Sequence, residues 1–338
     1  MGTMKNLSND QMTGQRLMVG FDGTEFNAGL KFLIGTLKVG GIILFARNIE
    51  NPGQLTRLCG DMRDYARACG QPPLFISIDQ EGGAVARLRQ PHFREFPGIP
   101  ALSNPVDAKN FALDMAGELS ALGINMNMAP VLDIAPREMQ SIMARRSFGH
   151  DPMHVAAMGK AMIENFQKQR IMAVAKHFPG IGRTILDSHL DMPEFDASLD
   201  DLIAFDLIPF QGAVKAGVAG MMLSHIYYKQ IDPRWPASLS PAIASGLLRR
   251  RMGFDGIVMT DDLDMGAIVK HFDIRTIIGQ ILASEIDIAL ICHKGPNIQI
   301  AFDEIQQRTA DDEGFAQKNR ESAARIMRLK AAYGLAES

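Results

Sequence analysis

Two histidines, a lysine and two aspartates lie close together in the segment Lys176–Pro193, which reads KHFPGIGRTILDSHLDMP. Asp187 and His189 are two positions apart, so on an extended backbone their side chains point to the same side. A carboxylate placed there can hold an imidazole in one tautomer and stabilise its protonated form. The pair could therefore act as a general acid and base, while an ordinary polar turn is the alternative interpretation.

Residues with ionisable side chains that could take part in catalysis recur at the ends of short apolar runs of the sequence. These residues are Asp79, Asp133, Lys176, His177, His225, Asp261, Asp262 and His293. In a barrel of parallel strands, the active site is built where the carboxyl ends of the strands meet. Any one of these residues alone could cap a helix or a turn. Their recurrence after most of the runs predicts one shared site.

Asp261 and Asp262 are adjacent, so on an extended backbone only one of them can face that site. Asp261 is nearer the apolar run GIVM, and we expect it to be the inward carboxylate. Asp262 is then expected to cap the following helix. Asp264 is expected in the first turn of that helix, where a negative charge is favourable.

The positioning elements are eight apolar runs that do not alternate with polar residues, as is typical of strands buried on both faces of a parallel sheet. They are Leu17–Gly20, Gly41–Phe45, Leu74–Ile78, Ile124–Met128, Ile171–Ala175, Gly220–Leu223, Gly256–Met259 and Ile286–Ile291. Helical periodicity separates them in most places. The expected helices are Asn27–Val39, a helix capped by Asp107 and followed by Gly123, Asp151–Gln169, Ser198–Ala216, Pro241–Arg251, Asp262–Leu282 and Gln317–Tyr333.

About eight strand–helix repeats with right-handed crossovers predict an α/β fold of the TIM type, a (β/α)8 barrel. A doubly wound open sheet is the alternative. No linker, low-complexity stretch or shift in composition divides the chain, so we expect a single domain over residues 1–338.

Net charge, apolar stretches and cysteine content indicate which binding partners and which cellular compartment suit the protein. The formal net charge is −3, and no long basic run occurs, which disfavours binding to nucleic acid or to an anionic membrane. No apolar stretch is long enough for a membrane span. Three cysteines without a Cys-x-x-Cys motif favour a reducing compartment over a zinc site. We therefore expect a cytoplasmic protein, without metal or cofactor, that acts as a monomer on a small-molecule substrate.

The motif KHFPGIGRTILDSH resembles the K-H-F-P-G-H-G-x4-D-S-H signature of the β-N-acetylglucosaminidase branch of glycoside hydrolase family 3. The blocks GIILFARNIENPGQL, IDQEGGAVARL, NMNMAPVLDIAP, RSFGHDP and GFDGIVMTDDLDMGAI resemble the other blocks of this branch, in the same order. The similarity runs from about Met18 to Cys292. It implies a TIM barrel and a single-domain enzyme that releases N-acetylglucosamine from cell-wall turnover fragments during peptidoglycan recycling.

The resemblance also implies a role for each matching residue. Asp261 would be the nucleophile that forms a covalent glycosyl-enzyme. His189, oriented by Asp187, would protonate the leaving oxygen and later deprotonate water. The residues that would bind the N-acetylglucosamine unit are Asp79, Arg87, Arg146, Lys176 and His177.

Three positions depart from the family pattern. Ile181 occupies the place of a second histidine, Ala84 that of an arginine, and Arg145 that of an asparagine or similar residue. Ile181 cannot donate a hydrogen bond through its side chain, and Ala84 removes a charge expected near the sugar pocket. We expect an active enzyme whose rate or specificity these changes affect.

Three other functions stay open at this stage. A metal-dependent amidohydrolase is also a barrel rich in His and Asp, but it needs His-x-His after the first strand, where this chain has GFDG. A sugar-binding protein without turnover would be a descendant of the same family. A phosphorylase would use phosphate in place of water, since a histidine acid/base does not repel that anion as a carboxylate would.

Overall fold

The computed structural model of the chain describes residues 7–184 and 192–335, in which eight parallel strands form a barrel. The strands are β1 (Leu17–Val19), β2 (Gly41–Leu44), β3 (Phe75–Ile78), β4 (Met126–Asn127), β5 (Met172–Phe178), β7 (Gly220–Leu223), β9 (Ile257–Thr260) and β10 (Ala289–Ile291). Each strand pairs with the next in this order, and β10 pairs with β1. One bridge between Met259 and Ile288 joins β9 to β10 and closes the ring. This closure confirms the (β/α)8 barrel and excludes an open doubly wound sheet.

Every residue of these eight strands is buried, which explains why the runs read as continuously apolar. The predicted runs and the observed strands agree within a few residues. The main difference is β5, which continues beyond Ala175 to Phe178. Lys176 stays in the ladder through a bridge to Val131, so it lies within the end of the strand instead of after it.

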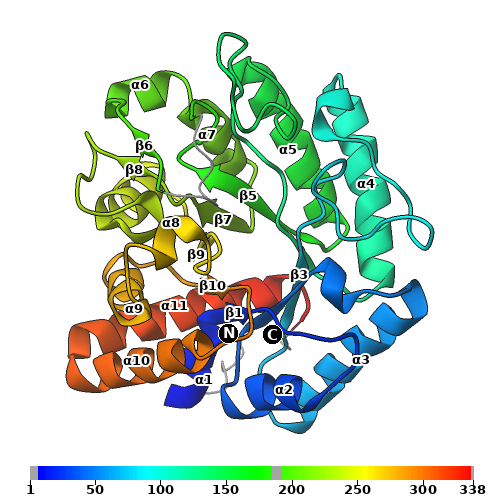
Figure 1. The fold of residues 1–338 in the computed structure, drawn as a ribbon, viewed down its shortest axis with the longest axis vertical. Helices are drawn as coiled ribbons and strands as arrows, with labels where there is room; N and C mark the ends of the chain where they lie inside the picture. The colour runs from blue at the N-terminus through cyan, green and yellow to red at the C-terminus, as the bar shows by residue number, and fades with distance from the viewer. Residues whose placement is uncertain (1–6, 185–191, 336–338) are drawn as a thin grey trace.

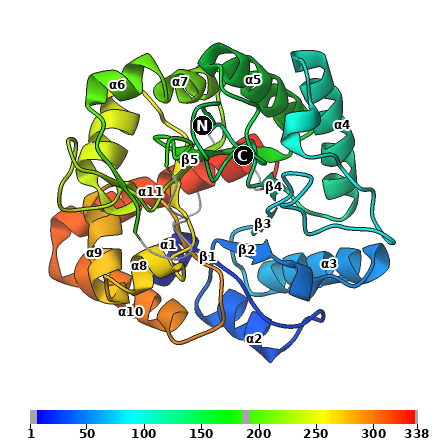
Figure 2. The ribbon, with the colours of Figure 1, turned by 45° about the horizontal axis from the view of Figure 1, so that its top comes forward.

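The helices form a ring around the barrel, and the chain proceeds around it in order, as the colours of Figures 1 and 2 show. The α-helices are α1 (Asn9–Gln15), α2 (Ala28–Lys31), α3 (Pro52–Ala68), α4 (Pro105–Ala121), α5 (Pro152–Lys168), α6 (Leu199–Ala204), α7 (Leu207–Lys215), α8 (Gly266–Val269), α9 (Ile274–Ala283), α10 (Asn297–Asp311) and α11 (Glu313–Ala332). Two segments, η1 (Phe32–Thr36) and η5 (Ala242–Arg251), are π-helical, and three short 3₁₀ turns are η2 (Ala46–Asn48), η3 (Ile99–Ala101) and η4 (Ala237–Leu239). A small parallel pair, β6 (Glu194–Phe195) and β8 (Tyr227–Tyr228), lies outside the barrel sheet.

The predicted cap of α4 was wrong. Asn104 is the N-cap, because its Oδ1 accepts hydrogen bonds from the amides of Val106 and Asp107. Pro105 takes the first helical position, where a missing N–H costs nothing, and this places Asp107 inside the first turn. Gly123 does follow the helix with a φ of +83°, as predicted for a residue just past its end.

Two predicted helices are each divided in the structure. The range 198–216 contains α6 and α7, and the chain turns between them at Phe205, where φ is −137°. The range 262–282 contains α8 and α9, and α8 begins only at Gly266. Asp262 therefore caps no helix, and Asp264 lies before the helix instead of in its first turn.

The barrel interior is a separate apolar cluster, rich in methionine. Its buried members are Met18, Ile43, Phe75, Met126, Met128, Met172, Val174, Ala219, Met222, Ile257, Met259, Ile288, Leu290, Cys292 and Ile326. Ile326 comes from α11, and Leu329 and Tyr333 of the same helix region pack against the cluster. Lys330 of α11 donates to the carbonyl of Gly40, just before β2 begins. Helix α11 therefore closes the amino-terminal end of the barrel.

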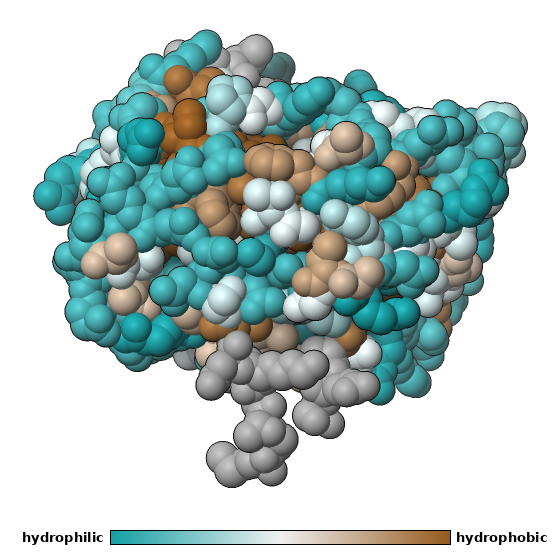
Figure 3. Space-filling view, turned by 90° about the horizontal axis from the view of Figure 1, so that it is seen from below, coloured by the Kyte–Doolittle hydropathy of each residue, from teal (hydrophilic) through white to brown (hydrophobic). Residues whose placement is uncertain are grey.

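No helix among the described residues is long and apolar enough to cross a membrane. The face drawn in Figure 3 is largely hydrophilic, and its apolar residues form small groups between polar ones. The exposed large apolar side chains come from different parts of the chain: Phe32, Val106, Met139, Met153 and Val269.

Candidate active site at the carboxyl ends of the strands

The strand-end residues come together because the eight strands are parallel and closed. Asp79 follows β3, Lys176 and His177 end β5, and Asp261 follows β9. Their side chains meet at the end of the barrel that α11 leaves uncovered. The carboxyl ends of the strands therefore form one common rim, as the sequence predicted.

Lys176 is the centre of a buried charge cluster. Its side chain is 3% exposed, and its Nζ lies 2.7 Å from Asp79 Oδ1 and 2.7 Å from Glu81 Oε1. Arg146 binds Glu81 with two parallel hydrogen bonds of 2.9 and 2.7 Å. Arg87 reaches the other oxygen of Asp79 at 3.4 Å. Four of the five predicted sugar-binding residues thus share one network, and their roles toward a sugar remain predictions.

Glu81 is the member of this cluster that we did not predict from the sequence. It is 1% exposed and holds both Lys176 and Arg146. The signal was available in the motif DQEGG, where Glu81 stands two positions after Asp79. That spacing would place both carboxylates on the same side of an extended chain.

The cluster fixes the charge state of its members. Burial by itself would raise the pKa of Asp79 and of Glu81, but the positive charges of Lys176 and of the arginines lower both pKa values below their usual range. Burial would likewise lower the pKa of Lys176, and the two carboxylates raise it instead. All three groups are therefore charged near neutral pH. Carboxylates and ammonium groups in this state form charge-assisted hydrogen bonds to hydroxyl groups.

His177 is held by a buried carboxylate from the neighbouring strand end. Its Nδ1 lies 2.7 Å from Asp133 Oδ2, and its backbone amide lies 3.2 Å from the same oxygen. The amide of Ile181 donates to Asp133 Oδ1 at 2.8 Å. Asp133 therefore orients the imidazole of His177 and anchors the start of the following loop with one side chain.

Asp261 is a partly buried carboxylate that stays ionised. Its Oδ1 accepts the amide of Asp262 at 2.8 Å. Burial would raise the pKa of Asp261, but His177, His225, the Asp262 amide and Lys176 together lower it below its usual value. An ionised carboxylate is what a nucleophile at an anomeric carbon requires.

His225 supports this arrangement from β7. Its Nδ1 lies 2.7 Å from Ser238 Oγ, and its Nε2 lies 2.8 Å from the carbonyl oxygen of Asp262. These contacts fix the imidazole next to the turn that carries Asp261. The histidine was among the strand-end residues noted in the sequence.

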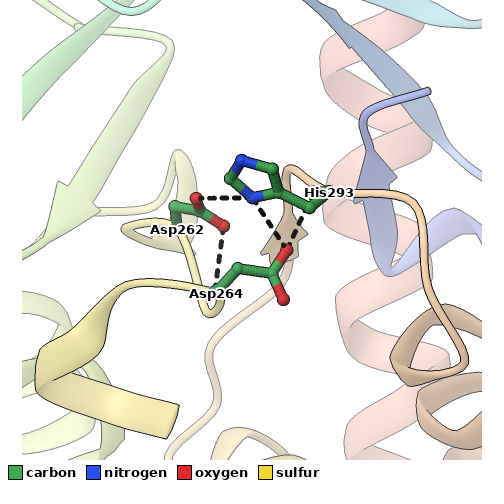
Figure 4. A group of neighbouring side chains, drawn as sticks. All are labelled: Asp262, Asp264 and His293. Atoms are coloured by element: carbon green, nitrogen blue, oxygen red, sulfur yellow. Dashed lines mark hydrogen bonds and ion pairs between the residues drawn. The ribbon is translucent and has the colours of Figure 1, made fainter. Parts of the chain in front are cut away.

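Asp262, Asp264 and His293 form a second polar group at the same end of the barrel (Figure 4). Asp262 Oδ1 accepts the amides of Asp264 at 3.0 Å and of Cys292 at 3.1 Å. Asp264 Oδ2 accepts the amide of His293 at 2.8 Å. Ligand atoms of the three side chains lie within 4.8 Å of one another, a spacing that a metal ion could bridge. Their contacts are explained by hydrogen bonds that join the ends of β9 and β10, and we assign no metal to them.

The chain resembles known proteins over nearly its whole length. Residues 9–329 match the Glycosyl hydrolase family 3 N terminal domain. The chain belongs to glycoside hydrolase family 3. It is 34% identical over 295 residues to the Beta-hexosaminidase of Pseudomonas aeruginosa, covering 86% of each chain. It is 35% identical over 291 residues to the Beta-hexosaminidase of Thiobacillus denitrificans, covering 83% of this chain and 79% of the other.

Two solved structures agree with this assignment. A β-N-acetylglucosaminidase from Paenibacillus sp. superposes with a TM-score of 0.94 at 34% identity, covering 98% of this chain and 64% of that longer one. A Beta-N-acetylhexosaminidase from Beutenbergia cavernae superposes with a TM-score of 0.89 at 29% identity, covering 97% and 99%. The resemblance seen in the motifs is thereby confirmed, and the protein is a family 3 glycoside hydrolase of the β-hexosaminidase type.

The side chains at the departures from the family 3 pattern make no polar contact with the charge cluster among the described residues. The side chain of Ile181 is 5% exposed and packs in the apolar core between barrel and helices. Ala84 is exposed, and its carbonyl accepts a hydrogen bond of 2.9 Å from Arg89. Arg145 is exposed as well. No polar group of Ile181 or Ala84 contacts Asp79, Lys176 or Glu81 among the described residues, so the ion pairs of the charge cluster form without them.

Asp187 and His189, the predicted acid/base pair, lie outside the described residues. Their geometry toward Asp261 therefore stays a prediction. The described residues on both sides of this segment, Thr184 and Met192, are buried.

Proposed function

We propose that this family 3 enzyme is a retaining exo-β-N-acetylglucosaminidase that removes terminal β-linked N-acetylglucosamine. The observation that carries the proposal is an ionised Asp261 at the end of β9, beside the cationic Lys176 and the oriented His177. The two solved relatives named above as acting on N-acetylglucosaminides or N-acetylhexosaminides support the choice of sugar.

In the proposed complex, the charge cluster holds the terminal sugar. Asp79 and Lys176 bind adjacent hydroxyl groups, since a carboxylate accepts from one hydroxyl while an ammonium donates to the next. Arg87, Arg146 and His177 add further donors around the ring. The buried Nε of Arg87 has no acceptor among the described residues, so a sugar oxygen would satisfy it.

The reaction proceeds in two displacements. In the first, a carboxylate oxygen of Asp261 forms a bond to the anomeric carbon while the bond to the leaving oxygen breaks. His189 gives its proton to that oxygen, and Asp187 stabilises the imidazolium. In the second, His189 takes a proton from water, the water oxygen bonds to the anomeric carbon, and Asp261 leaves as a carboxylate. Two inversions at one carbon retain the β configuration.

Histidine suits this role because its ordinary pKa of about 6.5 already permits proton transfer in both directions near neutral pH. A carboxylic acid would need burial or a nearby negative charge to raise its pKa into that range. The acid/base and the nucleophile therefore differ in chemical type and need not share one environment.

Peptidoglycan turnover fragments are the proposed physiological substrate, in which N-acetylglucosamine is joined to an anhydro-N-acetylmuramic acid unit. We also propose that the enzyme acts in the cytoplasm, as a monomer and without metal or cofactor. Release of N-acetylglucosamine from such fragments, measured with and without phosphate, distinguishes hydrolysis from phosphorolysis. If phosphate stimulates the release and N-acetylglucosamine 1-phosphate is the product, the acceptor is phosphate instead of water and the enzyme is a phosphorylase.

The nucleophile is tested by Asp261→Asn. We expect kcat/KM for 4-nitrophenyl N-acetyl-β-glucosaminide to fall by more than about a thousandfold, because no covalent intermediate can form. Asp264→Asn is the matched control, since this carboxylate lies at the same strand end and bonds a backbone amide. It should keep activity within about tenfold, the effect of a modest structural change.

The covalent intermediate is tested directly with a fluorinated N-acetylglucosamine analogue that accumulates the adduct. Peptide mass spectrometry should find the sugar on Asp261. A sugar on another side chain, or full activity of Asp261→Asn, contradicts the proposal. Binding of N-acetylglucosamine by calorimetry with no turnover of any chromogenic substrate would instead identify a sugar-binding protein.

A further inference from the structure

His225 continues the connection between β7 and β9 beyond the register of the two strands. The last paired residues are Leu223 and Thr260, and the amide of Asp261 donates to the carbonyl of Leu223 at 3.0 Å. Two residues after Leu223, the imidazole of His225 makes the next contact, with its Nε2 2.8 Å from the carbonyl oxygen of Asp262. The side chain of His225 therefore holds the residue that directly follows Asp261.

This contact determines which nitrogen of His225 carries a proton. A carbonyl oxygen can only accept a hydrogen bond, so Nε2 must donate to Asp262. On the other side of the ring, Nδ1 lies 2.7 Å from Ser238 Oγ, and a hydroxyl group can either donate to a ring nitrogen or accept from it. Each ring nitrogen thus has a suitable partner, and the two partners fix the orientation of the imidazole.

Ser238 is itself held by backbone hydrogen bonds on both sides of His225. The amide of Ser238 donates to the carbonyl of Ser224 at 2.9 Å. The amide of Ala237 donates to the carbonyl of Ile226, also at 2.9 Å. His225 is 1% exposed and Ser238 is fully buried. A buried donor that loses its acceptor costs free energy, so the imidazole is expected to stay in this position.

We infer that His225 is a positioning residue for the nucleophile: through the carbonyl of Asp262, it sets where the carboxylate of Asp261 lies. The connection is short, because the amide of Asp262 donates to Asp261 Oδ1 at 2.8 Å. A displacement of about 1 Å in a reacting group can lower a rate about a hundredfold. This inference rests on the proposed function, in which Asp261 attacks the anomeric carbon.

Three substitutions of His225 separate its bond to Asp262 from its bond to Ser238. Glutamine carries its amide nitrogen at the place of Nε2, so His225→Gln can still donate to the carbonyl of Asp262. Asparagine carries its amide nitrogen at the place of Nδ1, so His225→Asn reaches Ser238 alone and is the matched control. His225→Leu makes neither bond.

The kinetic readout is kcat/KM for 4-nitrophenyl N-acetyl-β-glucosaminide. It should fall by about a hundredfold in His225→Leu and in His225→Asn. In His225→Gln it should stay within about tenfold of the wild type, because the bond to Asp262 is kept. The inhibition constant of N-acetylglucosamine should change by less than about threefold in every variant, since the charge cluster is held by its own ion pairs.

A smaller folded fraction would also lower the rate, so thermal unfolding is measured for each variant and rates are expressed per folded enzyme. If His225→Leu fails to fold, the comparison of His225→Gln with His225→Asn still decides. Rescue by glutamine and not by asparagine supports positioning through Asp262, because a loss of packing would affect both variants alike.

Equal losses in His225→Gln and His225→Asn, full activity of His225→Leu, or an inhibition constant that rises in step with the lost activity would overturn the inference. Each of these results leaves the proposed function standing. Failure of the proposed function has a separate signature, since Asp261→Asn would then keep its activity.

Discussion

At the scale of single residues, Glu81 shows how the site is held together. It is buried between Lys176 and Arg146 and supplies the second carboxylate that keeps the lysine charged. Breaking a buried ion pair by removing one charge leaves the partners without compensation, which costs more than the pair contributes when intact. The charge cluster therefore depends on a residue that need not touch the proposed sugar.

Glu81→Gln should destabilise the protein and weaken sugar binding together. We expect a loss of about 3–5 kcal/mol in the free energy of unfolding, because the buried Lys176 and the partly buried Arg146 both lose a partner. Urea unfolding followed by circular dichroism measures it. Asp10→Asn is the control, since its ion pair with Lys38 is half exposed and should contribute less than about 1 kcal/mol. A loss at Glu81 no larger than at Asp10 would contradict this account.

At the scale of secondary-structure elements, the ends of β9 and β10 are joined by one carboxylate. Asp262 Oδ1 accepts amides from the turn before α8 and from Cys292 after β10. Burial, together with the negative charges of Asp264 and Asp261, raises the pKa of Asp262 to about 6, against the two amide bonds that lower it. The folded protein therefore holds this proton more tightly than the unfolded chain, where an Asp pKa is about 3.9.

The sign of the pH dependence follows from this difference. The contribution of Asp262 to stability is fully present below about pH 4 and is lost as the pH rises toward 6, because the folded state must then release its proton. The unfolding free energy of the wild type minus that of Asp262→Asn should fall by up to about 3 kcal/mol between pH 4 and pH 7. Urea unfolding at several pH values measures it. A flat difference, equal to that of the exposed control Asp61→Asn, would show that Asp262 is not perturbed.

At the scale of the whole molecule, the two ends of the barrel have different tasks. The carboxyl ends carry the charged site, while α11 covers the amino-terminal end with apolar side chains and one lysine. Lys330 is fully buried, donates to Gln15 and to the carbonyl of Gly40, and lies 4.5 Å from the ring centre of Phe75. Burial lowers the pKa of Lys330 to about 7.

Because of Lys330, the stability of the barrel should increase as the pH rises above 7. An unfolded lysine has a pKa of about 10.4, so the cost of burying its charge is present in full below about pH 7 and is relieved as the pH rises. The unfolding free energy of the wild type minus that of Lys330→Met should increase by about 2–3 kcal/mol from pH 7 to pH 9. Urea unfolding at both pH values tests it, with the exposed Lys109→Met as control. No increase would mean that Lys330 keeps its proton in the folded state.

The strand-end residues were predictable because a parallel barrel collects the carboxyl ends of its strands on one rim. Their positions at the ends of apolar runs also predicted that Lys176 and Asp79 serve one site, and the structure places Lys176 Nζ 2.7 Å from Asp79 Oδ1. The helix boundaries were less predictable. Asn104 and Asp107 are both good capping residues, and the signal that distinguishes them is Pro105, which favours the first helical position and so indicates a cap at Asn104. Asp262 was misassigned because its hydrogen-bond partner, Cys292, is 30 positions away in sequence.

The sequence by itself determined the class of fold, the common rim of polar residues and the family, since these depend on local patterns and on motifs within single segments. Only the tertiary structure decided that Glu81 binds Lys176, that Asp262 joins two strands, and that His225 bonds the carbonyl of Asp262. The physical reason is that a charge or a hydrogen-bond donor has no fixed partner until packing brings together segments that are distant in the chain. The periodicity of apolar residues indicates which side of a helix or strand is buried, but it carries no information about which residues pack against that side.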